Sequence, residues 1–213
     1  MITGNQRMIA RQIKGQGITW PPVLQAMRNV DRALFVPAHY MSHAYADGPL
    51  PIGYQQTISQ PYIVAYMLDQ LKPQPGDIAL EVGAGSGYAA AILSHLVKTV
   101  YALELIQPLC KEATRVLEEL GLDNIHMICQ NGCSGYAPAA PFDVIMVSCA
   151  ARRVPQPLID QLAPGGRMII PVGRGAFFQY LELYSKTHAG EIQQTRLLPV
   201  RFVPLVGEAG PGD

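Results

Sequence analysis

A chain of 213 residues with 49% hydrophobic residues is long enough to bury a sizeable core. Its 16 Lys and Arg balance its 16 Asp and Glu, and no basic run interrupts the chain. This balance excludes the electrostatic signature of nucleic-acid or anionic-membrane binding, so we expect neither partner. Without an apolar signal peptide or a span of roughly 20 apolar residues, we expect a cytoplasmic monomer whose four cysteines are reduced.

The N-terminal region, 1–72, begins with helical periodicity and then becomes rich in loops. Apolar residues recur at helical spacing at Met8, Ile9, Ile13, Val23, Leu24 and Met27. Loop-type sequence follows over 48–53 and 57–61. Thr57 or Ser59 is expected to cap a helix over Ile63–Leu71, with Pro61 in its first turn.

The remaining two regions, 73–176 and 177–213, contain the predicted sheet. We predict strands at 78–82, 99–103, 125–129, 142–147 and 166–172, and helices at 88–97, 108–120 and 155–162. Apolar strands separated by helices indicate a mostly parallel, doubly wound α/β sheet of the Rossmann type. Two further strands within 177–205, joined near 188–190, predict an antiparallel addition before a frayed tail from Gly207. We expect a single domain over 1–213.

The most informative segment is the glycine-rich turn between the first predicted strand and the helix after it. Gly83, Gly85 and Gly87 have G-x-G-x-G spacing, Glu81 precedes them, and Glu104 ends the next strand. Dinucleotide enzymes have the longer G-x-G-x-x-G spacing. Glu104 can accept hydrogen bonds from both hydroxyls of a ribose, and Glu81 suits an ammonium and a sulfonium but would repel a diphosphate. The pattern indicates an adenosyl ligand without a pyrophosphate, unless the two acids only end a strand and begin a helix.

Several segments, in the same order along the chain, resemble the protein-L-isoaspartate O-methyltransferases among the class I methyltransferases. The glycine segment 80–88 fits many methyltransferases, whereas Gln56–Pro61 is much more discriminating. The other similar segments are 34–37, 44–47, 49–53, 164–167, 170–173 and 202–205.

This resemblance implies an enzyme with S-adenosylmethionine as cofactor and S-adenosylhomocysteine as product. Its acceptor would be the free α-carboxylate of isoaspartyl residues in damaged proteins, and the methyl ester would then collapse to a succinimide and start repair. The resemblance gives Ser59 a catalytic role at the acceptor carboxylate. The expected cofactor-binding residues are Thr57, Ile58, Gln60, Glu81, Gly83, Gly85, Gly87, Glu104, Leu105, Asn131 and Gly132.

Two positions depart from the family pattern. Asn131 stands where these enzymes usually have an acid that accepts a hydrogen bond from the adenine amino group, and its carbonyl oxygen can still accept. Gln55 stands where the loop often has a glycine. These departures leave open a methyltransferase of the same fold acting on another carboxylate, in a specific peptide or small molecule. A cofactor-binding adaptor without catalysis is the alternative outside enzymes.

The remaining cysteines and histidines give weaker signals. His126, Cys129 and Cys133 lie close in sequence but lack a second ligand pair, so we expect no metal site. Cys129 is interpreted as strand core, and Cys110 and Cys149 as small core residues.

Overall fold

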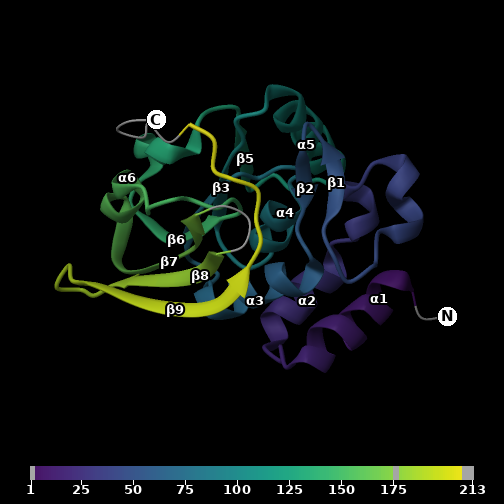
Figure 1. Cartoon of the computed structure of the whole chain (residues 1–213), viewed down its shortest axis with the longest axis horizontal. Coiled ribbons are helices and arrows are strands. Elements are labelled where there is room, and N and C mark those ends of the chain that lie inside the picture. Colours follow the sequence, from purple (N-terminus) through teal and green to yellow (C-terminus); the bar gives the residue numbers. More distant parts are fainter. Residues whose placement is uncertain (1–2, 175–177, 208–213) are drawn as a thin grey trace.

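The computed structural model describes residues 3–174 and 178–207 and is built around a seven-stranded sheet (Figure 1). The strand order is β5-β4-β3-β6-β7-β8-β9. The strands are β3 (Ile78–Val82), β4 (Thr99–Leu103), β5 (Ile125–Ile128), β6 (Phe142–Val147), β7 (Leu162–Arg174), β8 (Phe178–Lys186) and β9 (Ile192–Val200). The pairs among β3 to β7 are parallel, and β8 and β9 are added antiparallel. The predicted doubly wound sheet with its antiparallel addition is therefore confirmed, while the tail beyond 207, predicted to fray, lies outside the described residues.

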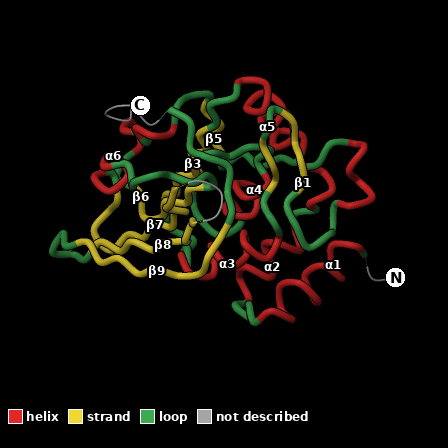
Figure 2. Tube along the Cα trace, in the orientation of Figure 1, coloured by secondary structure: helices red, strands yellow, loops and turns green. Residues whose placement is uncertain are grey.

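The two faces of the sheet are covered by different elements. Alternate strand residues such as Ala79 and Val144 share one core with α2 (Pro21–Asn29), α3 (Pro61–Leu71), α4 (Tyr88–Ser94) and α5 (Gln107–Glu119). Their strand neighbours Leu80 and Ile145 face a smaller core with α6 (Gln156–Asp160) and loops. Figure 2 shows α1 (Gly4–Met8) and α2 gathered near α3, apart from α6. The apolar alternation along the strands thus buries both faces, as a parallel sheet requires.

The N-terminal helical region follows the predicted periodicity. All six apolar residues that carry the pattern are buried: Met8, Ile9, Ile13, Val23, Leu24 and Met27. α1 continues through a wider π-helical turn over Ile9–Ile13 and a 3₁₀ turn over Lys14–Gln16. Pro21 at the first position of α2 lacks the N–H that a first turn leaves unpaired anyway.

The loop-rich run after this region is a two-stranded hairpin that periodicity did not predict. β1 (Leu50–Gly53) pairs antiparallel with β2 (Gln56–Ile58). Tyr54 and Gln55 form its turn with φ values of 52° and 60°. Strands of four and three residues are too short for a recognisable alternation, and their pairing depends on contacts with the rest of the fold.

The predicted start of α3 needs correction at its cap. Pro61 occupies the first turn as expected, but Gln60 is the N-cap residue and no side chain caps the helix. Thr57 is part of β2. The hairpin therefore takes up Thr57, and neither it nor Ser59 caps the helix.

The end of α4 also differs from the predicted helix 88–97. The helix ends at Ser94, where Nδ2 of Asn124 donates to the Ser94 carbonyl at 2.9 Å. A side chain from 30 residues later thus satisfies a carbonyl that a longer helix would have paired itself.

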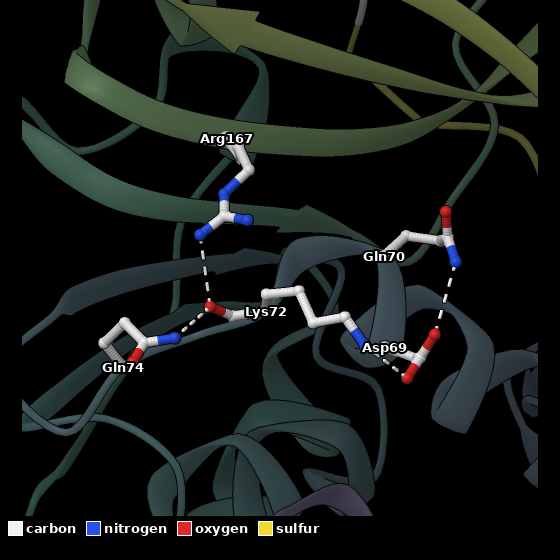
Figure 3. Close-up of polar contacts among 5 residues, drawn as sticks. All are labelled: Asp69, Gln70, Lys72, Gln74 and Arg167. Carbon is white, nitrogen blue, oxygen red and sulfur yellow. Dashed lines mark hydrogen bonds and ion pairs between the residues drawn. The ribbon is translucent and has the colours of Figure 1, made fainter. Parts of the chain in front are cut away.

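The C-terminal end of α3 is tied to the sheet by the contacts in Figure 3. Lys72 adopts a left-handed conformation with φ of 48°, and its carbonyl accepts from Arg167 Nη2 at 3.2 Å and Gln74 Nε2 at 2.8 Å. The Lys72 ammonium pairs with Asp69 at 2.7 Å. Arg167 belongs to β7, so this carbonyl fixes the helix end against the strand across 95 residues of sequence.

The cysteines depart from the expectation of four reduced thiols. Cys110 in α5 and Cys129 after β5 form a disulfide with a Cα–Cα distance of 5.7 Å. The two cysteines meet because α5 packs against β5, a contact that their separation of 19 residues does not reveal. Cys133 and Cys149 lie outside this disulfide, and Cys149 is buried as expected.

Candidate functional site

The site lies at the carboxyl ends of the central strands, where the strand order reverses between β3 and β6. Ligands of open parallel sheets bind at such a switch point because loops diverge there and leave a crevice. Here the crevice holds two adjoining cavities, of about 200 Å³ and about 30 Å³. Thr57, Gly83, Gly85 and Ser148 line both, so the two spaces meet at the glycine loop.

The larger cavity has one acidic wall and one apolar wall. Predicted residues Glu104, Leu105 and Gly132 line it, together with Ile106. The apolar wall is the segment Val203–Val206, which crosses the sheet ends after β9 (Figure 1). This segment is held by Ala150, whose N–H donates to Val203 and whose carbonyl accepts from Leu205, each at 2.8 Å.

Glu104 is held in a fixed orientation by backbone donors. It is 6% exposed, and its Oε2 accepts from the Gly85 N–H at 2.8 Å while Oε1 accepts from the Ile106 N–H at 2.8 Å. A carboxylate has about four lone-pair positions. Both oxygens therefore retain acceptor capacity for a pair of hydroxyl groups in the larger cavity.

Glu81 is buried at the end of β3 and has one oxygen without a partner. Its side chain is 0% exposed, Oε1 accepts from the Ser148 hydroxyl at 3.0 Å, and Oε2 has no hydrogen bond. Burial raises the pKa of the Glu81 carboxyl to about 8, against the lowering effect of the Ser148 hydrogen bond. A buried acid of this kind is stabilised in its ionised form by a cation that enters the small cavity.

The glycine loop needs glycine for both conformation and space. Gly83 has φ of 79°, and a Cβ there would lie 2.9 Å from Cys149 Sγ. Gly85 has φ of 55°, and its N–H is the donor to Glu104. A side chain at either position would strain the backbone and move the donor that orients the acid.

The smaller cavity brings Ser59 to the glycine loop. Thr57, Ile58 and Ser59 line it opposite Glu81 and the loop residues, with Tyr88 and Ala89 at the start of α4. Segments 22 or more residues apart in sequence thus meet around one small cavity, lined by Ser59 and by Glu81.

Three predicted residues lie beside the cavities and do not line them. Gly87 is the N-cap residue of α4, and Gln60 donates from Nε2 to Asp47 Oδ1 at 2.8 Å. Asn131 Oδ1 accepts from the Cys133 N–H at 2.9 Å, and its Nδ2 donates to the Gly207 carbonyl at 3.4 Å. The Asn131 carbonyl oxygen therefore already holds a short helical turn, next to Gly132 in the cavity wall.

Sequence reasoning missed Ser148 and the wall Val203–Val206. Ser148 directly follows β6, and the rule that sites gather at strand carboxyl ends offered a signal for it. The segment 202–205 was recognised as similar to the family, but no periodicity or charge places it over the sheet. Its position depends on the hydrogen bonds with Ala150.

The described residues fit an adenosyl ligand that carries a sulfonium and an amino group. The fixed Glu104 carboxylate suits two vicinal hydroxyls, the apolar wall suits an aromatic base, and the unpaired Glu81 oxygen suits a cation. Among the residues that the structure describes, no His, Cys, Asp or Glu group of three could hold a metal ion, and Cys129 is engaged in the disulfide. Nor does any helix within 3–174 or 178–207 have the length and apolarity to cross a membrane.

Comparison with known proteins gives consistent results. A family model described as Protein-L-isoaspartate(D-aspartate) O-methyltransferase matches residues 3–210. The chain is 48% identical over 204 residues to Protein-L-isoaspartate O-methyltransferase 1 of Nitrosospira multiformis, covering 95% of this chain and 86% of that protein. It is 46% identical to a Gloeobacter violaceus Protein-L-isoaspartate O-methyltransferase, with 94% and 98% covered. A Plasmodium falciparum beta-aspartate methyltransferase solved with S-adenosyl-L-homocysteine is similar in structure, with a TM-score of 0.84, 27% identity, and 95% and 98% of the chains covered.

Proposed function

This chain belongs to the protein-L-isoaspartate(D-aspartate) O-methyltransferase family, and we propose that it methylates the free α-carboxylate of isoaspartyl residues in damaged proteins. It is an S-adenosylmethionine-dependent carboxyl methyltransferase with isoaspartyl proteins as substrates. Methyl transfer leaves S-adenosylhomocysteine and an ester, and ester formation starts repair. The observation that carries the proposal is the small cavity that Ser59 lines together with the glycine loop and Glu81.

Most of the expected cofactor-binding residues have a task in this proposal. Glu104 accepts from the ribose hydroxyls, Leu105 and Gly132 flank the base, and Glu81 faces the amino and sulfonium end. The glycines allow the ligand to approach the backbone, and Thr57 lies where the two cavities meet. When bound, S-adenosylmethionine supplies a methyl group activated by its sulfonium.

The acceptor needs positioning more than activation. A chain-end carboxylate has a reference pKa of about 3.5, so it is ionised at neutral pH and requires no general base. The Ser59 hydroxyl donates to one carboxylate oxygen and leaves the other free to attack in line. Alignment of two reactants can lower a barrier by about 7–11 kcal/mol in favourable cases. The residues that line the small cavity supply this alignment.

A second candidate acceptor is favoured by two particular residues. Asn131 has its carbonyl oxygen engaged with Cys133, and Gln55 replaces a glycine at the tip of the hairpin that carries Thr57. A changed adenine contact or hairpin would suit another carboxylate, in a specific peptide or a small molecule. A panel of labelled acceptors separates this alternative from isoaspartyl repair.

The test compares an isoaspartyl peptide with its normal aspartyl isomer. The two peptides have the same charge, so only geometry can distinguish them, and we expect methyl ester formation on the isoaspartyl peptide alone. Equal rates on both peptides would contradict the repair function while leaving the methyltransferase in place.

Replacement of Ser59 tests its catalytic role. In Ser59→Ala we expect turnover to fall about tenfold to hundredfold, with cofactor affinity changed little, because the hydroxyl contacts the acceptor. Ser185→Ala in β8, paired with Arg167 away from the cavities, is the matched control and should keep full turnover. Unchanged turnover in Ser59→Ala would remove the hydroxyl from the mechanism. Monomeric state and cytoplasmic location belong to the same proposal, and sedimentation and cell fractionation test them.

A further inference from the structure

A fully buried arginine lies directly behind the acceptor side of the small cavity. Arg32 is 0% exposed. Its Nη1 donates to the Ala44 carbonyl at 2.5 Å, and its Nη2 donates to the carbonyls of Gly48 and Ser59, each at 3.0 Å. Among the described residues no carboxylate forms an ion pair with Arg32, and its Nε has no partner.

The two carbonyls that share Nη2 are at the base of the β1–β2 hairpin. Gly48 precedes β1 and Ser59 follows β2, and the strands pair from Leu50 with Ile58 at this end. One nitrogen therefore joins both ends of the hairpin. This contact fixes the backbone of Ser59 as well as the angle at which the hairpin leaves the N-terminal region.

The hairpin covers the glycine loop. The Ile52 side chain packs over Gly85, where an added Cβ would lie 3.2 Å from Ile52 Cδ1. Thr57 lines both cavities, and Ile58 and Ser59 line the smaller one. A movement at the base of the hairpin would therefore displace Ser59 relative to the glycine loop.

Arg32 also contacts the helix that follows the glycine loop. The centre of its guanidinium lies 6.0 Å from the centroid of the Tyr88 ring. Tyr88 is the first residue of α4 and lines the small cavity beside Ser59. The same side chain thus joins the acceptor segment to the element that begins at the glycine loop.

We propose that Arg32 is a positioning residue of the acceptor site, which holds Ser59 in register with the glycine loop through its bonds to Gly48 and Ser59. The inference rests on the proposed function, since it assigns Ser59 to the acceptor. A buried charge without an ionic partner destabilises the folded protein. Arg32 offsets this cost by fixing two carbonyls of the loop before β1, those of Ala44 and Gly48, to the carbonyl of Ser59 after β2. The planar fork of an arginine can reach all three, whereas a lysine ammonium is a single point charge on a flexible stem.

The experiment replaces Arg32 by Lys and by Met and measures four quantities. These are kcat and KM for an isoaspartyl peptide, cofactor Kd by calorimetry, and amide hydrogen exchange along the chain. We expect kcat/KM to fall about tenfold to hundredfold in Arg32→Met and less in Arg32→Lys, because small misplacement of a reacting group is costly. Cofactor Kd should stay within about threefold, and exchange should rise over residues 48–60 and stay unchanged in β3 and α5.

Arg167→Lys provides the matched control. Arg167 also donates to a backbone carbonyl, that of Lys72, but it joins α3 to β7 away from both cavities (Figure 3). We expect this variant to lose stability with unchanged kcat/KM and unchanged exchange over residues 48–60. Equal falls in kcat/KM for the Arg167 and Arg32 variants would overturn the positioning role.

Two further outcomes are decisive. If Arg32→Met does not fold, the test rests on Arg32→Lys. A kcat/KM equal to that of the wild-type protein in Arg32→Lys would then overturn the proposal. A parallel loss of cofactor affinity and a rise in exchange throughout the molecule would also overturn it, since both indicate a general structural role. If the wild-type protein fails to methylate the isoaspartyl peptide, the proposed function fails. Hydrogen exchange over residues 48–60 in the Arg32 variants still tests separately whether Arg32 fixes the hairpin through Gly48 and Ser59.

Discussion

At the residue scale, the site contains two acids, Glu81 and Glu104, whose surroundings differ. Backbone donors hold both oxygens of Glu104, whereas Glu81 is buried with one oxygen unpaired and the pKa of its carboxyl is raised to about 8. The spacing of these acids around the glycines was readable from sequence. The raised pKa of the Glu81 carboxyl was not, because it arises from the burial of the side chain in the folded protein.

Cofactor affinity should therefore depend on pH through Glu81. The free protein holds the Glu81 proton up to about pH 8, and a bound sulfonium favours the ionised carboxylate. Binding then releases a proton at lower pH, so affinity should rise by up to about tenfold per pH unit between pH 6 and 7.5. The amino group of the ligand stays mostly charged in this range, with a reference pKa of about 7.7–8.0.

Calorimetry in buffers of different ionisation enthalpy measures this proton release directly. Glu81→Gln is the control, with weaker affinity that does not change with pH over the same range. The stability of the free protein changes with pH in the direction opposite to cofactor affinity. Because the pKa of Glu81 in the folded protein is raised above its unfolded value of 4.5, the free protein loses stability as pH rises from about 4.5 to about 8. A flat affinity profile in the wild-type protein would place Glu81 away from the cation.

At the scale of elements, the β1–β2 hairpin connects the N-terminal region to the site. Its turn has positive φ at both central residues, Tyr54 and Gln55, a geometry typical of a type I′ turn. Asparagine and glycine are favoured at such positions, whereas most other residues are strained there by the contact of their Cβ with the backbone. The departure at Gln55 that sequence comparison raised is therefore a conformational cost in the hairpin turn.

Replacement of Gln55 by glycine should stabilise the protein. Left-handed backbone costs a residue with a side chain about 1–2 kcal/mol, and part of this gain is offset by the greater freedom of glycine in the unfolded chain. We expect a rise of about 1 kcal/mol in the free energy of unfolding, measured in urea. Gln56→Gly is the matched control: it lies in β2, where glycine should destabilise by about 0.5–1 kcal/mol. A loss of stability in Gln55→Gly would contradict the turn assignment.

At the scale of the whole molecule, contacts distant in sequence close the fold around the site. Arg167 joins β7 to the end of α3, Ala150 holds the wall Val203–Val206, and the Cys110–Cys129 disulfide joins α5 to the end of β5. Ile106, just before α5, and Gly132, just after Cys129, both line the larger cavity. The disulfide thus fixes two sides of the larger cavity relative to each other.

The disulfide gives a prediction about the purified protein. Alkylation of the denatured protein without reductant should modify two of the four cysteines, and all four after reduction. Because the disulfide closes a loop of 19 residues, the double variant Cys110→Ser, Cys129→Ser should lose about 3 kcal/mol of unfolding free energy. Cys133→Ser, outside the disulfide, serves as control and should change stability little. Four alkylated cysteines in the non-reduced protein, measured by mass, would show that the bond does not form.

The sequence by itself determined the succession of strands and helices along the chain, the location of the glycine loop and its acids, and the family. The strands at 78–82, 99–103 and 142–147 match the structure residue for residue, because short, mostly apolar runs between helices are typical of a parallel sheet that is buried on both faces. The glycine loop could be identified from the sequence because a backbone with positive φ that approaches its neighbours closely requires glycine at these positions.

Only the tertiary structure decided the features that depend on contacts between distant segments. The hairpin was too short for periodicity, the disulfide required α5 to pack on β5, and Arg32 is an unremarkable basic residue in the sequence. Its three carbonyl partners lie 12 to 27 residues away, and the wall Val203–Val206 meets Ala150 from more than 50 residues further along. The local sequence sets secondary-structure propensity and the pattern of apolar residues. The backbone groups that bind one arginine or line one cavity are brought together only when distant segments pack in the folded protein.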